Sequence, residues 1–394
     1  MSGESTKKLF LSHHSERAGE VLDLAHELSL RGIVPWIDKH GGLNIGDYFP
    51  SEARRAIRED CFGLLLYATD KAFDRPIIRD IELDEAKKCH LADPNYLLFA
   101  VPRGISFTQL SELSISKLGF DLSPFHTVNI PDGEHLTAAH AEVSRRVLKR
   151  MLAQHTIGSP NVVPLQFSTR ELLDQQGERV LCINAVPLLA VNPANTQAWE
   201  RLLIGLRDVK REIAASFGRP CLQVDGSKHL SAAFMFGRVF SPFRVKIRQT
   251  DDDWWATYGH TPKAALLTPR LVTSGGGGTL FVEVSVRSKG VSAAVDQYLR
   301  TSGIAPDLRL QFQPAAGPLT LDDALCRATA DQVYSEIEKV AAAHHLEEIH
   351  LFVSAPQSFM MMLGQRFKGL PLTSLHEWTG TRYVFACSVP AGAL

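Results

Sequence analysis

The feature that most constrains this chain is a regular alternation between short apolar runs and longer stretches of helical periodicity. Over residues 8–155, apolar runs at 8–12, 33–38, 61–68 and 96–101 are joined by short connections to these helical stretches. The helical stretches are 18–31, 50–59 and 77–90. This alternation is typical of an α/β domain in which helices cover both faces of a parallel sheet. The sequence therefore predicts a doubly wound sheet whose ligand crevice lies beyond the carboxyl ends of its strands.

A second alternating region follows a short stretch rich in Gly, Ser, Pro and Asn, which we interpret as a linker. The predicted strands of this region are 179–185, 231–240, 243–249, 279–287, 307–312, 349–354 and 382–387. Its predicted helices are 196–217, 292–301, 320–345 and 358–367. Their pattern indicates two similar strand–helix halves that divide near residue 300. The predicted organisation is a domain at 1–155, a linker at 156–165 and a second domain at 166–394.

Charge and composition exclude several classes of protein. The formal net charge is −1, so the chain has no overall basic field that would attract DNA or a membrane surface. The longest apolar run is too short to span a bilayer, and no signal peptide is recognisable. The 6 cysteines are scattered without a CxxC pair, which favours buried free thiols in a reducing compartment. We therefore expect a cytoplasmic protein with no metal site.

Several polar and aromatic residues share one edge of the predicted N-terminal sheet. They end the first two strands, lie in the Gly-rich loop that follows, or lie on the helix after the third strand: Ser12, His13, Trp36, Asp38, Leu43 and Glu82. An edge with these groups suits a ribose or a nucleotide. The residues by themselves do not name a reaction.

These segments resemble a TIR domain over about residues 7–150. The residues that carry the resemblance are Lys8–Ser15, Trp36–Asp38, Leu43–Asp47, Ala53–Ile57, Leu64–Ala68 and Arg79–Ala86. The resemblance implies a flavodoxin-like doubly wound fold and, in the enzymatic members, cleavage of NAD⁺ by a glutamate with an alanine four residues later. Glu82 and Ala86 fit that spacing, whereas the usual preceding Ser and Trp are absent. Glu85 lies close enough to leave the register between the two glutamates open.

A single carboxylate is chemically sufficient for this reaction. Nicotinamide leaves NAD⁺ as a neutral molecule, so no general acid is needed, and the transition state resembles an oxocarbenium ion. A positioned carboxylate such as Glu82 stabilises that developing positive charge, and Trp36 offers a ring for stacking. Without the resemblance, Glu82 is explained by favourable interaction with a helix dipole, Trp36 by core packing and Asp38 by capping of the following loop.

The C-terminal region resembles the SAVED sensor domains over about residues 165–394. The carrying residues are His229–Arg238, Phe281–Val286, Ile349–Pro356 and Met362–Gly364. The resemblance implies two fused CARF-like, Rossmann-like halves that bind a cyclic di- or trinucleotide. Hydrolytic motifs are absent from the sequence, and the Gly-rich stretch 274–279 lacks the Lys of a P-loop. We therefore interpret this region as a binding module.

A cyclic oligonucleotide needs N–H or cationic donors for its phosphates and flat surfaces for its bases. The candidate contacts are Lys228, Arg238, Ser285, Arg287, Ser354, Met362 and Trp378. Further possible stacking residues are Trp254, Trp255 and Tyr383. Ser354 is the preferred candidate because it follows an apolar strand, where ligand sites occur at strand ends. Taken singly, each of these residues is better explained by a solvated charge or by core packing than by ligand contact.

The order of the two regions, a TIR-like domain followed by a SAVED-like domain, resembles an effector arrangement of the CBASS antiviral defence. The resemblance implies an NAD⁺ hydrolase that releases nicotinamide and linear or cyclised ADP-ribose. It needs no cofactor and is activated by a cyclic oligonucleotide, most simply cyclic tri-AMP. We expect activation by ligand-driven assembly into an oligomer or filament. Two alternatives are a non-enzymatic TIR scaffold that signals by TIR–TIR assembly, and a C-terminal region that degrades nucleotide.

Overall fold

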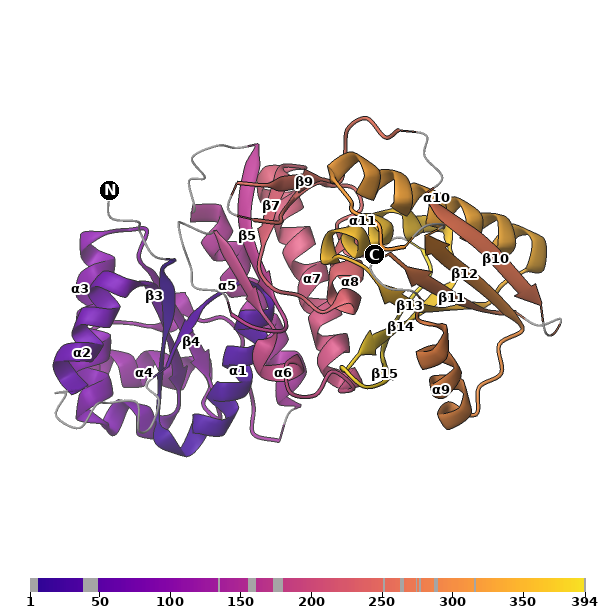
Figure 1. Ribbon diagram of the computed structural model, residues 1–394. Coiled ribbons are helices and arrows are strands. Elements are labelled where there is room, and N and C mark those ends of the chain that lie inside the picture. Colours follow the sequence, from indigo (N-terminus) through magenta and orange to yellow (C-terminus); the bar gives the residue numbers. More distant parts are fainter. Residues whose placement is uncertain are drawn as a thin grey trace. The chain divides into compact units, whose positions relative to one another are not determined.

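The structure is a computed structural model that divides the chain into two compact units. It describes residues 6–37, 49–133, 135–154, 161–172, 180–250, 252–262, 266–273, 275, 278–286, 290–314 and 317–392. The N-terminal unit comprises Met1–Gly158 and Asp174–Ile183, and the C-terminal unit comprises Ser159–Leu173 and Asn184–Leu394. The boundary lies within β6 (Leu181–Asn184), and both units appear in Figure 1. No described helix is long and apolar enough to cross a membrane.

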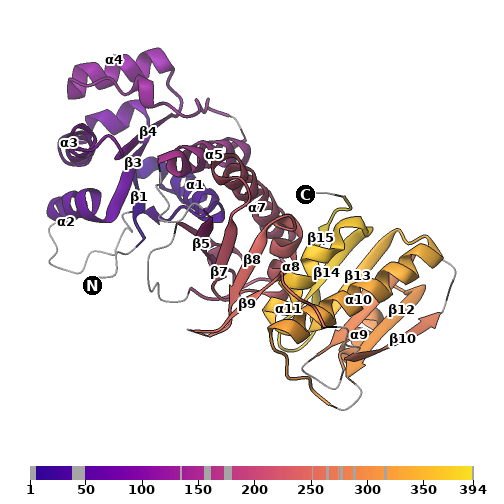
Figure 2. The same cartoon turned by 90° about the horizontal axis from the view of Figure 1, so that it is seen from above.

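The N-terminal unit is built on a four-stranded parallel sheet of order β2-β1-β3-β4. Its strands are β1 (Lys8–His13), β2 (Pro35–Trp36), β3 (Cys61–Ala68) and β4 (Leu97–Pro102). Its helices are α1 (Ala18–Leu30), α2 (Phe49–Arg55), α3 (Asp84–Ala92), α4 (Phe107–Leu118) and α5 (Leu136–Gln154). Figure 2 shows α1 and α5 on one face of this sheet, and α2 and α3 on the other. The predicted parallel α/β arrangement is confirmed, and its topological switch point lies between β1 and β3.

Two π-helical segments interrupt the helices on one face of this sheet. Ala56–Asp60 continues α2, and Ile78–Leu83 precedes α3. The sequence predicted ordinary helices at both places, because a π-helical turn keeps an apolar periodicity close to that of an α-helix. Such turns are rare and occur often at functional sites. The structure also contains short 3₁₀ helices at Ser15–Arg17, Asp70–Asp74, Ser123–Phe125 and Phe367–Gly369.

The C-terminal unit contains two sheets of similar construction. In the first, β5, β7 and β8 are parallel and β9 is antiparallel to β8. The second has the order β10-β12-β11-β13-β14-β15, in which β12, β11, β13 and β14 are parallel. The first sheet has the order β6-β5-β7-β8-β9, and its strands besides β6 are β5 (Val162–Ser168), β7 (Cys221–Asp225), β8 (Arg244–Arg248) and β9 (Trp254–Ala256). Those of the second are β10 (Leu267–Thr273), β11 (Thr279–Ser285), β12 (Leu308–Pro314), β13 (Glu348–Ser354), β14 (Leu372–Trp378) and β15 (Tyr383–Val389).

The helices of this unit reinforce the correspondence between its two halves. They are α6 (Val186–Leu189), α7 (Thr196–Phe217), α8 (Leu230–Val239), α9 (Ser292–Ser302), α10 (Asp323–His344) and α11 (Gln357–Arg366). Helix α8 follows β7 as α11 follows β13, and the two helices pack directly on each other. At their crossing, a Cβ on Gly237 would lie 2.0 Å from the carbonyl oxygen of Met361, and one on Gly364 would lie 2.2 Å from that of Phe234. The crossing therefore has reciprocal glycines, as expected of two similar halves.

Several predicted boundaries in this region are wrong. Residues 231–240 were predicted as a strand but form most of α8, because an apolar run that is buried on every side carries no period that separates helix from strand. The predicted linker 156–165 is too long, since β5 begins at Val162. The halves divide between β9 and β10 and not near residue 300, because β11 pairs with β13 in the second sheet.

Candidate functional sites

The candidate site of the N-terminal unit centres on a buried pair, Ser12 and Glu82. Ser12 lies at the carboxyl end of β1, beside the switch point, and its hydroxyl donates a hydrogen bond of 2.6 Å to Glu82 Oε2. Glu82 lies in the π-helical segment Ile78–Leu83, and both side chains are buried. The structure thus brings together two predicted residues that are 70 positions apart in the chain.

Glu85, the other glutamate that the TIR resemblance left open as the catalytic residue, has a different partner. Its Oε1 accepts hydrogen bonds from Arg58 Nε at 3.0 Å and from Arg58 Nη2 at 2.8 Å. Glu85 is therefore held in an ion pair away from Ser12, whereas Glu82 contacts the end of β1. This geometry favours Glu82 over Glu85 as the carboxylate of the candidate site.

The remaining predicted residues of this site differ in their surroundings. Trp36 is partly buried and stacks on Phe10, with ring centroids 4.4 Å apart, so one face of its indole is used in core packing. His13 lies 3.3 Å from the carbonyl oxygen of Leu11 through Nδ1. Asp38 and Leu43 lie outside the described residues.

Sequence reasoning missed a cation beside this edge. Immediately after β1, His14 Nε2 accepts a hydrogen bond of 3.0 Å from Arg75 Nε. Arg75 precedes the helical segment that carries Glu82. Arg75 lies in a loop between two helical segments, where the sequence shows no hydrophobic periodicity. Its position beside His14 was therefore visible only in the structure.

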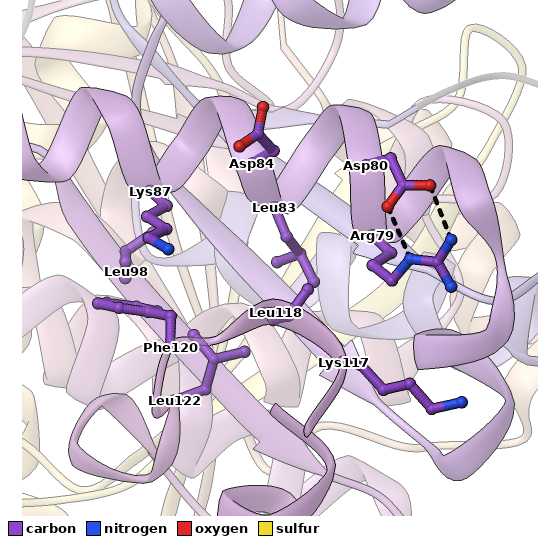
Figure 3. Close-up of a pocket in the computed structure, with 10 residues that line it drawn as sticks. All are labelled: Arg79, Asp80, Leu83, Asp84, Lys87, Leu98, Lys117, Leu118, Phe120 and Leu122. Carbon is purple, nitrogen blue, oxygen red and sulfur yellow. Dashed lines mark hydrogen bonds and ion pairs between the residues drawn. The ribbon is translucent and has the colours of Figure 1, made fainter. Parts of the chain in front are cut away.

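A second pocket is lined in part by other residues of the helical segment that carries Glu82, and neither Ser12 nor Glu82 belongs to its lining (Figure 3). Its volume is about 220 Å³, and it is lined by Arg79, Asp80, Leu83, Asp84, Lys87, Leu98, Lys117, Leu118, Phe120 and Leu122. Its cations already have partners: Arg79 pairs with Asp80 at 2.6 Å, and Lys117 pairs with Asp74 at 3.1 Å. Lys87 lies over the ring of Phe120. We assign no ligand to this pocket.

The C-terminal unit has a larger cavity at the carboxyl edge of its second sheet. Its volume is about 420 Å³, and it is lined by Arg170, Leu230, Gly290, Val291, Ala294, Val353, Ser354, Ala355, Glu377, Trp378 and Tyr383. Ser354 ends β13 and Trp378 ends β14, which are parallel neighbours. The switch point of this sheet lies between β11 and β13, next to Ser354, where ligands of open α/β sheets bind.

Aromatic and charged side chains give this cavity its chemistry. Trp378 is exposed and meets Tyr383 edge to face, with ring centroids 5.2 Å apart. Arg170 is exposed and supplies a cation. Glu377 is buried and accepts hydrogen bonds from the start of α8. Burial raises the pKa of Glu377, and these hydrogen bonds from Ser231 and Leu230 oppose that shift.

Of the predicted ligand contacts, Ser354 and Trp378 line the cavity. Ser285 is the cross-strand partner of Ser354, but it is buried and is not part of the lining. Tyr383, a predicted stacking residue, lines the cavity, whereas Trp254 and Trp255 lie in β9. Arg287 lies outside the described residues.

Three predicted contacts are placed in the interior instead. The ammonium of Lys228 is buried and donates to the carbonyl oxygen of Gly226 at 2.6 Å, and burial lowers its pKa to about 7. Arg238 is buried in α8 and donates through Nη2 to the carbonyl oxygens of Lys368 and Gly392. Met362 is fully buried in α11.

Sequence reasoning missed Arg170 and Glu377. Both residues belong to strands, or follow strands, that the sequence did not predict. Arg170 comes shortly after β5, and Glu377 lies in β14. Among the described residues, no group of three or more His, Cys, Asp or Glu side chains is arranged to hold a metal ion.

Comparison with known proteins agrees with this description of the C-terminal unit. Residues 206–389 match the SAVED family, described as the SMODS-associated and fused to various effectors sensor domain. CD-NTase-associated protein 4 of Acinetobacter sp. (strain ATCC 27244 / 9458) is 25% identical over 190 residues, which cover 47% of this chain and 40% of that protein. The protein of the same name from Moraxella osloensis gives the same identity and coverage. The chain thus spans less than half the length of these curated relatives.

Solved structures show a similar fold. The Acinetobacter baumannii Cap4 SAVED/CARF-domain containing receptor with the cyclic trinucleotide 3′3′3′-cAAA has a TM-score of 0.50 and 15% identity, covering 87% of this chain and 85% of that chain. The same receptor with 2′3′3′-cAAA has a TM-score of 0.50 and 16% identity, covering 86% and 84%. At this identity the likeness concerns the fold. Residues 206–389 therefore match the SAVED family of sensor domains, and the fold of the α/β chain is similar to that of the Cap4 receptors.

Proposed function

We propose that the C-terminal unit binds a cyclic oligonucleotide and thereby activates cleavage of NAD⁺ by the N-terminal unit. The observation that carries the sensing part is the cavity beside Ser354, which combines a cation, an aromatic wall and a strand-end position. The match to a sensor family over 206–389 supports it, because that segment contains all the lining residues except Arg170.

The chemistry of the cavity suits one nucleotide of a cyclic ring. Trp378 supplies a flat surface for a base, and a base stacked on an aromatic side chain gains about 1–3 kcal/mol. Arg170 supplies a positive charge for a phosphodiester. The structurally similar Cap4 receptors hold cyclic tri-adenylates, so we propose cyclic tri-AMP as the activator.

For the N-terminal unit, the Ser12–Glu82 pair supports the catalytic proposal. In the proposed reaction, the bond between C1′ of the ribose and the nicotinamide nitrogen breaks, and nicotinamide leaves with the electron pair. Water, or an adenine nitrogen in a cyclised product, then attacks C1′ and loses a proton. Glu82 stabilises the cationic ribose, and the hydroxyl of Ser12 holds Glu82 Oε2 in place.

Activation needs two states with different affinity for the ligand. Assembly provides such a pair of states, and head-to-tail contacts between sensor domains extend into a filament when their symmetry does not close. We therefore propose that ligand binding drives homo-oligomerisation and places N-terminal units beside one another. The alternative is that the N-terminal units do not cleave NAD⁺ and that the assembled units signal as a scaffold through contacts between them.

The test compares Glu82→Gln with Glu85→Gln in the full chain. Nicotinamide release from NAD⁺ is measured with and without cyclic tri-AMP, and activator affinity is measured by titration calorimetry. Glu82→Gln should lose nearly all turnover and keep activator binding. Glu85→Gln breaks the ion pair with Arg58 and is the matched control, which should retain most of the turnover.

Three outcomes would contradict parts of this proposal. Full turnover in Glu82→Gln would refute the catalytic role of Glu82. No turnover in the wild type with bound activator would favour the scaffold. A saturated protein that stays monomeric in sedimentation, with turnover per molecule independent of concentration, would refute activation by assembly.

A further inference from the structure

The floor of the C-terminal cavity contains an anion where a phosphate would be expected to bind. Helix α8 begins at Leu230, and the first N–H groups of a helix form an anion site. Here that site is occupied by the carboxylate of Glu377. Oε1 accepts from Leu230 N at 3.3 Å, and Oε2 accepts from Ser231 N at 3.0 Å and from Ser231 Oγ at 2.9 Å.

The two carboxylate oxygens differ in their remaining capacity. Each carboxylate oxygen accepts about two hydrogen bonds. Oε2 has two donors from Ser231, whereas Oε1 has one, from Leu230. Glu377 is only 3% exposed, and the area that it exposes faces the cavity. The cavity lining thus includes one carboxylate oxygen with remaining acceptor capacity, and Glu377 already occupies the N–H groups of Leu230 and Ser231 at the start of α8.

This arrangement determines which part of a nucleotide enters. A phosphate at the floor would meet the negative charge of Glu377, while Arg170 in the same cavity attracts it. An N–H donor on a base forms a charge-assisted hydrogen bond with a carboxylate. A base N–H donor is therefore better matched to Glu377 than a phosphate is, and Trp378 and Tyr383 of the same lining offer it aromatic surfaces.

We propose that Glu377 is a specificity-determining residue that recognises the exocyclic amino group of the ligand's base. A single acceptor position suits a single amino group, as on adenine, better than the two adjacent N–H donors of guanine, which pair with both oxygens of a carboxylate. This inference rests on the proposed binding of a cyclic oligonucleotide and extends it to the choice of base.

The other half of the unit provides an internal comparison. In α11, Ser358 occupies the same second position as Ser231 in α8, and its hydroxyl donates to Gln249 Oε1 at 3.3 Å. Gln249 directly follows β8, and Glu377 is the penultimate residue of β14, so a residue near the end of a strand accepts from the helix of the other half in both cases, an amide in one and a carboxylate in the other. Gln249 does not line the cavity, and it is therefore a suitable control position.

The experiment titrates the full chain with cyclic tri-adenylate and cyclic tri-inosinate, in which a keto oxygen replaces the amino group. Wild type should prefer the adenylate by roughly tenfold or more, because inosine places a keto oxygen where adenine has its amino donor, and its one remaining donor, N1–H, lies at a different position on the edge of the base. Glu377→Gln keeps a carbonyl oxygen for Ser231 and presents an NH₂ group to the cavity. It should reduce that preference at least several-fold or reverse it, and Gln249→Glu should leave it unchanged.

A second ligand makes the test independent of any variant. A cyclic tri-purine ribonucleotide lacks the amino group without adding bulk, and wild type should bind it several-fold more weakly than cyclic tri-adenylate. Equal binding of these two ligands, or an unchanged adenylate-to-inosinate ratio in Glu377→Gln, would overturn the inference. Failure of wild type to bind any of the three ligands would instead overturn the proposed sensing function.

Discussion

The crossing of α8 and α11 gives the sharpest stability prediction, through Gly237→Ala. The added Cβ would lie 2.0 Å from the carbonyl oxygen of Met361, whereas a carbon–oxygen contact needs about 3.3 Å. Both groups belong to backbones, so no side chain can rotate away and the helices must separate by roughly 1 Å. A gap of that size forfeits about a quarter to a half of each dispersion contact along the interface.

The expected magnitude follows from two opposing effects. Overpacking of a core costs about 1–3 kcal/mol, and a backbone–backbone clash belongs at the upper end. Replacing a helical glycine by alanine returns about 1 kcal/mol of helix propensity. The net loss should be about 2 kcal/mol, which lowers the melting temperature of a unit of this size by roughly 4–8 °C.

Scanning calorimetry of the full chain measures this loss. Gly19→Ala is the matched control, because Gly19 lies in α1 and a Cβ there meets nothing within 4 Å, so its unit should melt at the same or a higher temperature. Gly364→Ala should resemble Gly237→Ala, and the double variant should lose less than the sum because one separation accommodates both methyl groups. If Gly237→Ala melts like the control, the close-packed crossing is wrong.

Two further predictions concern buried charges. Because burial lowers the pKa of Lys228 to about 7, the folded state releases this proton at a lower pH than the unfolded chain does, and stability should rise with pH above about 7. Between about pH 7.5 and 9, the free energy of unfolding of wild type, measured by urea denaturation, should rise by about 1 kcal/mol per pH unit relative to that of Lys228→Met. If the unfolding free energies of the two proteins change in parallel with pH, this prediction is wrong. In α1, Glu27→Ala removes the carboxylate that lies 2.5 Å from the fully buried Arg31, and should destabilise the N-terminal unit by about 3–5 kcal/mol. The double variant Glu27→Met, Arg31→Met should lose much less, and a loss as large as that of Glu27→Ala would show that the unpaired charge is not the cause.

The sequence was most informative where a pattern repeats locally. The strand 61–68 and the helix 196–217 occur with the predicted bounds, because an apolar run or a helical period is visible in neighbouring residues. The position of Ser354 at a strand end was predictable for the same reason. The strands β7 and β14 were missed, since polar residues interrupt the apolar residues in both of them and leave no apolar run.

The candidate sites depended more strongly on tertiary structure. The sequence by itself determined the parallel α/β class and the strands 8–12, 61–68 and 349–354, and hence the sheet edges to which Ser12, Glu82 and Ser354 belong. Only the fold decided that Glu82 rather than Glu85 contacts Ser12, because that choice depends on how a π-helical turn rotates the helix. Only the fold placed Glu377 at the start of α8, 146 residues from Ser231. Local periodicity carries no information about such pairings, since they arise when packed helices and strands bring distant polar groups out of water and oblige them to satisfy one another.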